Sequence, residues 1–336
     1  MLSLKKAGDI LRQYDIQADE ATEAVSRIQE WRKTFEPPTQ TIYVSLIRAA
    51  KKVDITASTA RRLKKIQSIQ YKLRRNEKMQ LPTMQDIGGC RAVLSSVENV
   101  RTLSDLMEKS KSKRKLIKKV DYIDTPKKSG YRGIHLIFSQ PTLIGSELVD
   151  KKIEVQIRTN LQHIWATAVE LAELATNYKL KSGEGTDEWK RFFAIASSAF
   201  ALQEESPLVP NTPTTMDEIV TELQALDKAH HFITRLQALR HFKQVLENLD
   251  IFTELSTKDK HFILSIDAEK KSYRVESYKK YADAYKAYTE KERLENGVDS
   301  VVLVSVESYN KLQKMYPNYF ADIREFLGIL ETLMET

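Results

Sequence analysis

Several features that define other classes of protein are missing or scarce in this sequence. Its 336 residues contain one cysteine, Cys90, which excludes a disulfide within the chain, the usual zinc finger and a CxxC redox pair. No run of about 18 apolar residues occurs, and the N-terminal stretch lacks an apolar segment of signal-peptide length, so we expect a cytoplasmic protein without a membrane-spanning helix. Ten glycines and nine prolines disfavour an all-β sandwich or a disordered chain.

The charge that is present is unevenly distributed. The formal net charge is +7, and residues 101–132 alone hold eleven Lys and Arg against four acids. Residues 61–75 hold seven bases and no acid. Such a concentration favours polyphosphate or nucleic acid as a partner, although two solvated helix faces would give the same pattern.

Hydrophobic periodicity predicts an α+β domain in the first part of the chain. Short Val- and Ile-rich runs bounded by Gly, Pro or Ser predict strands, and apolar residues at helical spacing predict helices. The expected strands are 86–94, 115–123, 133–138 and 151–157. The expected helices are 4–34, a stretch ending at 53, 63–75, 97–109, 160–176 and 187–203. We therefore expect a mixed sheet flanked by helices.

A proline-rich segment predicts the boundary of a second domain. Pro207, Pro210 and Pro213 lie close together, and Thr214 or Thr215 can cap a following helix. We expect domains at 1–205 and 217–336, joined by a linker at 206–216. The second should be mostly helical (215–254, 275–294 and 307–334), with a small sheet from 261–267 and 300–307.

The first cluster that could carry chemistry is basic. Lys64, Ser68 and Lys72 are spaced four residues apart in the predicted helix 63–75, which places them on one face, with Arg62 at its start. Two ammonium groups and a guanidinium converging there would suit a triphosphate. Solvated lysines on an ordinary helix are the alternative.

Two further clusters lie at the ends of predicted strands. Asp86 begins a buried strand and is a candidate Mg²⁺ ligand, and Arg91 in that strand could lie flat on a nucleobase. Tyr131 and His135 are four residues apart in an extended segment, so they share a face, on which an exposed aromatic ring and an imidazole can stack a base and contact phosphates. A turn acid, a strand-edge arginine and a hairpin corner with a core histidine are the structural alternatives.

The fourth cluster is the most informative. In the predicted strand 151–157 and its end, Glu154, Gln156 and Arg158 alternate with Val155 and Ile157, so the three polar side chains share one face. Aligning three polar groups on a strand is costly unless that face lines a wet site. This run therefore predicts a site at the end of the strand.

Together, the order and spacing of the four clusters over about residues 40–200 resemble the synthetase domain of the RelA/SpoT family. This resemblance implies a transfer of pyrophosphate from ATP to a ribose 3′-hydroxyl, with Mg²⁺. It assigns the ATP to Arg62, Lys64, Ser68, Lys72 and Arg91, the Mg²⁺ to Asp86 and Glu154, the proton acceptor to Glu154, and the acceptor nucleotide to Tyr131, His135, Gln156 and Arg158. None of the six histidines precedes an aspartate, so we expect no alarmone hydrolysis.

Within this family, the sequence is similar to fused toxin–antitoxin members of the CapRel type, whose second domain is zinc-finger-like without metal ligands. This similarity implies anti-phage defence and the 3′ end of tRNA as acceptor. The basic residues of the stretch 109–119 would help to hold an RNA backbone through phosphate contacts, and we assign this role to Lys113, Arg114, Lys118 and Lys119. A guanine nucleotide acceptor, giving the alarmone (p)ppGpp, and a non-catalytic RNA-binding module are the alternatives.

The second domain is expected to restrain the first. Tyr316 and Tyr319 flank a proline-fixed bend, and we expect them to cover the ATP-side residues around Arg62 and Lys72. A triggering protein that binds the second domain, of phage origin if the CapRel similarity holds, would shift the protein to an open form.

Overall fold

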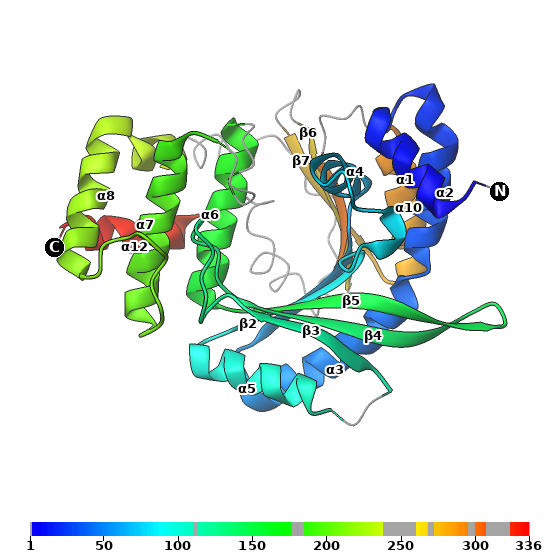
Figure 1. Cartoon of the computed structure of the whole chain (residues 1–336), viewed down its shortest axis with the longest axis horizontal. Coiled ribbons are helices and arrows are strands. Elements are labelled where there is room, and N and C mark those ends of the chain that lie inside the picture. The colour runs from blue at the N-terminus through cyan, green and yellow to red at the C-terminus, as the bar shows by residue number, and fades with distance from the viewer. Residues whose placement is uncertain are drawn as a thin grey trace.

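The computed structural model describes residues 2–110, 113–176, 180, 185–237, 260–267, 272–294, 300–306 and 323–335 (Figure 1). The helices are α1 (Leu4–Gln13), α2 (Thr22–Lys33), α3 (Glu36–Val53), α4 (Ile66–Arg75), α5 (Val97–Glu108), α6 (Asn160–Thr176), α7 (Asp187–Gln203), α8 (Met216–His230), α10 (Tyr281–Leu294) and α12 (Arg324–Glu335). The strands are β1 (Ser58–Leu63), β2 (Gly88–Leu94), β3 (Lys115–Asp121), β4 (Ile134–Ile144), β5 (Glu147–Thr159), β6 (His261–Asp267), β7 (Ser272–Tyr278) and β8 (Ser300–Val306).

The strands form one eight-stranded sheet in the order β3-β4-β5-β2-β1-β8-β6-β7. β2 and β5 run parallel, with Gly89 opposite Glu154, and the other neighbouring pairs are antiparallel. The sheet is therefore mixed, which confirms the α+β class. The parallel register matters for the site because it brings the start of β2, next to Asp86, beside the polar face of β5.

The main core lies between the sheet and helices α1, α2, α3, α5 and α10. Leu11, Ile28 and Leu46 are fully buried in it, together with Ala284 of α10. A second core joins α6, α7, α8 and α12, which lie together on the opposite side of the molecule from α1 and α2 (Figure 1). No helix within the described segments has the length and apolar character needed to cross a membrane.

Several expected elements differ in extent from those observed. The predicted helix 4–34 is divided into α1 and α2, and Pro37 and Pro38 lie in the first turn of α3, where a missing N–H group costs little. The helix expected at 63–75 begins only at Ile66, and the preceding strand β1 was not predicted. Strand β7 was also missed, since part of it falls in the helix expected at 275–294.

The segment expected as a second domain contributes to both cores. The small sheet predicted there continues the main sheet, because β8 pairs with β1 through residues such as Ser305 opposite Arg61. Helix α8 begins at Met216 and is capped by Thr215, whose side chain forms a capping box with Glu218. The division at 206–216 remains a prediction, and Tyr316 and Tyr319 lie outside the described residues.

Candidate active site

Residues of three of the four polar clusters line one cavity near the junction of β1, β2 and β5, whereas Tyr131 and His135 of the third cluster, and Arg158 of the fourth, lie outside its lining. Strand register explains the meeting, since Ala60 pairs with Arg91 and Gly89 lies beside Glu154. The lining residues are Ala60, Arg62, Lys64, Asp86, Gly89, Cys90, Arg91, Glu154 and Gln156. Of the predicted ATP-side residues, Ser68 and Lys72 lie outside this lining.

Two lysines converge on one carboxylate at the edge of the cavity. Lys64 Nζ and Lys72 Nζ each lie 2.9 Å from Asp86 Oδ2. We had expected from their spacing that Lys64 and Lys72 share a helix. This prediction was wrong, because Lys64 lies between β1 and α4 and only Lys72 lies in α4. The two ammonium groups nevertheless meet, since α4 folds back from the end of β1 and places Lys72 next to Asp86.

The environment of Asp86 fits a divalent cation. Burial raises the pKa of this carboxyl group, but the charges and hydrogen bonds of Lys64 and Lys72 outweigh burial and lower the pKa to about 2. Asp86 Oδ1 is buried and accepts no hydrogen bond within the described part of the chain. Mg²⁺ is commonly held by one or two carboxylates with phosphate oxygens and water, so Asp86, with Glu154 across the cavity, fits Mg²⁺.

The lysine pair predicts a loss of stability in acid. Asp86 has a lowered pKa in the folded state, so its stabilisation is present above about pH 4 and is lost as the pH falls towards about 2. We expect the wild-type protein to lose about 1 kcal/mol more unfolding free energy than Asp86→Asn between about pH 6 and pH 3. Urea unfolding without Mg²⁺ measures this difference, and parallel losses would contradict it.

The predicted alternation along β5 is present. Val155 and Ile157 are fully buried in the main core, while Glu154 and Gln156 face the cavity. Arg158, the third polar residue on that face, is itself only 4% exposed. The face is therefore polar and largely enclosed, so charges on it interact more strongly than they would in water.

Glu154 belongs to a closed ring of five hydrogen-bonded side chains. Its Oε1 accepts from His135 Nδ1 at 2.9 Å, and its Oε2 accepts from Gln156 Nε2 at 2.7 Å. Arg158 Nη2 donates to Gln156 Oε1 at 3.0 Å and to the Tyr131 hydroxyl at 2.6 Å. That hydroxyl lies 2.5 Å from His135 Nε2. Because a carboxylate only accepts, a neutral His135 carries its proton on Nδ1 and accepts from Tyr131 at Nε2.

The ring determines the charge states of its members. Burial raises the pKa of Glu154, but the hydrogen bonds from His135 and Gln156 act in the opposite direction, and the pKa lies below its usual value. Burial raises the pKa of Tyr131, so its hydroxyl group keeps its proton at neutral pH and can donate. Glu154 is consequently ionised and able to accept a proton.

Tyr131 does not present the exposed ring that we had expected. Its side chain is only 7% exposed, and Arg158 and Lys127 lie 4.9 Å from the ring centroid. The enclosure arises because positive φ angles at Gly130 and Gly133 turn the loop inward. Lys127, which also lies 4.3 Å from the Tyr122 ring, is a residue that we missed. Its position, only four residues before Tyr131 in the same loop, was the feature of the sequence that could have indicated this contact.

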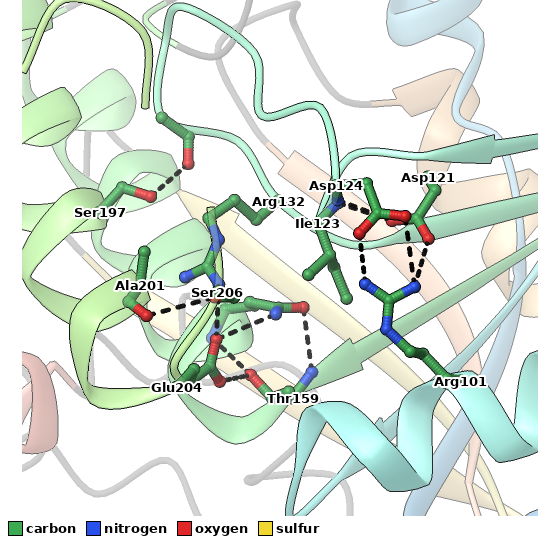
Figure 2. A network of polar contacts seen from close by, with 12 residues as sticks. Arg101, Asp121, Ile123, Asp124, Arg132, Thr159, Ser197, Ala201, Glu204 and Ser206 are labelled. Carbon is green, nitrogen blue, oxygen red and sulfur yellow. Dashed lines mark hydrogen bonds and ion pairs between the residues drawn. The ribbon is translucent and has the colours of Figure 1, made fainter. Parts of the chain in front are cut away.

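A buried network holds this loop against helix α7 (Figure 2). Arg132 donates to Glu204 at 2.9 Å and to Ser206, and the carboxylate of Glu204 also accepts from Thr159 and from Gln162. The side chains of Arg132 and Glu204 are 2% and 8% exposed. The network thus ties the loop that precedes β4 to the end of β5, next to Arg158.

The basic residues proposed for tRNA binding are only partly available. Lys113 and Lys118 are exposed at and beside the edge strand β3. Arg114 is not, because its side chain is buried on the Phe138 ring and donates to the Met107 carbonyl group. Lys119 is exposed but forms ion pairs with two acids of α5. The assignment of Arg114 to a surface that binds RNA was therefore wrong.

The cationic side chains that gather on the half-buried Asp86 give the cavity the charge that suits a polyphosphate. A sequence model described as the region found in RelA / SpoT proteins matches residues 61–182. The GTP pyrophosphokinase YwaC of Bacillus subtilis is 32% identical over 146 residues, which cover 41% of this chain and 67% of the relative. The chain belongs to the RelA/SpoT family.

A second relative and a solved structure also resemble this chain. The GTP pyrophosphokinase YjbM of Bacillus subtilis is 31% identical over 170 residues, which cover 50% of this chain and 74% of that protein. The crystal structure of small alarmone synthetase 1 from Bacillus subtilis, bound to its product pppGpp, has 25% identity and a TM-score of 0.45. That likeness covers 53% of this chain and 94% of the other.

Proposed function

We propose that this protein is an ATP-dependent pyrophosphokinase that transfers pyrophosphate to a ribose 3′-hydroxyl group. The observation that carries the proposal is the convergence of Lys64 and Lys72 on Asp86 in a cavity that Glu154 also lines. The two relatives named as GTP pyrophosphokinases support the same reaction class.

The residues of the cavity divide into a donor side and an acceptor side. The acceptor oxygen attacks the β-phosphorus of ATP, the bond from that phosphorus to the oxygen of the α-phosphate breaks, and AMP leaves. This step requires neutralisation of the triphosphate charge, which Arg62, Lys64 and Lys72 supply. The acceptor hydroxyl group is a weak nucleophile, and Glu154, held ionised, takes its proton. Mg²⁺, held by Asp86 and Glu154, would further neutralise the phosphate oxygens.

We favour the 3′ end of tRNA as the acceptor. The exposed Lys113 and Lys118 provide positive charge at the sheet edge, where phosphates of an extended RNA backbone could bind. A guanine nucleotide is the second candidate, favoured by the names of both relatives. Transfer to tRNA would block aminoacylation and inhibit translation, consistent with a fused toxin–antitoxin protein in anti-phage defence that a foreign protein releases through residues 217–336.

Incubation with ATP labelled at the γ-phosphate tests the proposal directly. Label on the 3′ end of tRNA supports the favoured acceptor, and label on GDP or GTP supports alarmone synthesis. Transfer to neither acceptor, with intact RNA binding, would instead indicate a non-catalytic RNA-binding protein.

The exposed Lys113 and Lys118 at edge strand β3 predict that tRNA modification can be lowered without a change in ATP binding. We expect Lys113→Glu/Lys118→Glu to lower tRNA modification roughly tenfold or more at moderate salt, because each lost phosphate contact weakens binding. The Michaelis constant for ATP should stay unchanged. Lys5→Glu/Lys6→Glu on the exposed face of α1 makes the same change in net charge and serves as control. Equal effects of both double variants would contradict a specific RNA-binding edge.

A further inference from the structure

Helix α10 presents a row of tyrosines to basic residues of the N-terminal half. Tyr281, Tyr285 and Tyr288 are spaced at four and three residues, so they lie along one face of the helix. The Tyr281 ring lies 4.7 Å from the Arg61 guanidinium group, and the Tyr285 hydroxyl donates to the backbone carbonyl of Gln29 at 3.2 Å. This face therefore forms part of the main core beside α2, as the arrangement of α10 and α2 in Figure 1 indicates.

The hydrogen-bond partner of Tyr288 is Arg32, which also contacts the segment at the cavity. Arg32 of α2 is fully buried, and its Nη2 lies 3.2 Å from the Tyr288 hydroxyl. Its Nη1 donates to the backbone carbonyl of Lys64 at 3.2 Å. A single buried guanidinium group thus connects α10 to the segment that carries a cavity lysine.

The Lys64 peptide groups are held from two directions. The carbonyl group accepts from Arg32, and the N–H group donates to the Ile87 carbonyl at 2.8 Å. Ile87 directly follows Asp86, the residue that Lys64 Nζ contacts. The contact with Ile87 continues the β1–β2 register one residue beyond the Leu63 and Gly88 pair. The backbone on both sides of the Lys64 side chain is therefore hydrogen-bonded.

Helices α2 and α10 lie outside the range that the family's sequence model matches. The family match ends at residue 182, whereas α10 covers Tyr281–Leu294. The neighbouring β8 pairs with β1 at Arg62, which places Val304 opposite another cavity residue. The C-terminal segment thus adjoins the donor side of the cavity through both α10 and β8.

We propose that Tyr288 is a positioning residue for the donor side of the cavity. Its hydroxyl group holds Arg32, and Arg32 holds the Lys64 carbonyl, so that α10 sets the position of the Lys64 ammonium group. This inference rests on the proposed function, since it takes Lys64 as a contact of the ATP phosphates. It assigns to the C-terminal segment a supporting role in ATP binding.

The test is the kinetics of the full-length Tyr288→Phe variant. Removal of the hydroxyl group keeps the ring, which lies 5.3 Å from the Arg32 guanidinium group, but removes the acceptor of Arg32 Nη2. We expect the Michaelis constant for ATP to rise about tenfold, with kcat and the Michaelis constant for the acceptor within about twofold of wild type. Calorimetric titration with a non-hydrolysable ATP analogue should show the same loss of affinity. Arg32→Lys, which cannot bridge both oxygen atoms as a guanidinium does, should reproduce the effect.

Tyr285→Phe is the matched control, because it removes a buried hydroxyl group from the same helix, one that donates to the backbone carbonyl of Gln29. A purely structural role would lower the folded fraction in both variants without changing ATP affinity. The proposal is overturned if folded Tyr288→Phe binds ATP like wild type, or if Tyr285→Phe weakens binding equally. Failure of wild type to transfer pyrophosphate to any acceptor would overturn the proposed function instead.

Discussion

Replacement of Glu154 by glutamine is expected to lower the rate constant of pyrophosphate transfer by about 100- to 10,000-fold, the usual contribution of a general base. Glutamine has nearly the same shape, and its amide oxygen can still accept from His135 or Gln156, but it cannot take a proton. We therefore expect the variant to fold and to bind ATP. Single-turnover transfer of labelled pyrophosphate, with saturating acceptor, measures the loss.

Glu147→Gln provides the control for this change. Glu147 lies at the other end of β5 with an exposed side chain, so the same substitution there should leave transfer unchanged. If Glu154→Gln transferred pyrophosphate at the wild-type rate, Glu154 would not be the base. The hydrogen-bonded ring would then serve only to maintain the structure.

The second large effect is expected at the buried pair of Arg132 and Glu204. Removing one partner of a buried ion pair leaves the other charge uncompensated, so Glu204→Ala should lower the free energy of unfolding by about 3–5 kcal/mol. The change also removes the acceptor for Thr159 and Gln162. Chemical denaturation followed by circular dichroism measures this loss.

Glu222→Ala is the matched control for stability. Glu222 pairs with Arg191 through two hydrogen bonds, but their side chains are 28% and 37% exposed. Exposed pairs contribute about 0–1 kcal/mol, so this variant should remain close to wild type. Equal losses at Glu204 and Glu222 would show that burial does not distinguish the two pairs.

Local pattern was sufficient for much of the sheet and for its polar face. The Val- and Ile-rich runs predicted strands β2, β3, β4 and β5, and their period of two placed Glu154 and Gln156 on the same side. The family resemblance is likewise carried by order and spacing along the chain, and the comparisons confirm it. These properties depend on neighbouring residues, which the sequence displays directly.

The same kind of pattern misassigned Lys64. Its distance of eight residues from Lys72 predicted a shared helix, but the chain before Ile66 is extended and pairs with β2 and β8. Strand pairing with residues about 30 and 240 positions away decides this conformation, and local spacing carries no signal of such partners. The lysines converge because the end of β1 and helix α4 both lie next to Asp86, not because one helix aligns them.

Composition by itself determined that the chain cannot form an internal disulfide and carries a positive net charge. The order of the residues located the basic region between residues 61 and 132, and periodicity predicted the α+β class and most of the elements. Only the tertiary structure decided which charges are available. Arg114 and Lys113 are adjacent in sequence, yet one lies buried on Phe138 and the other in solvent. Tyr131 is enclosed by Arg158 and Lys127, and Arg32 meets Tyr288 from 256 residues away. Burial and pairing depend on which segments fold together, and this is a property of the whole chain that no local run of residues contains.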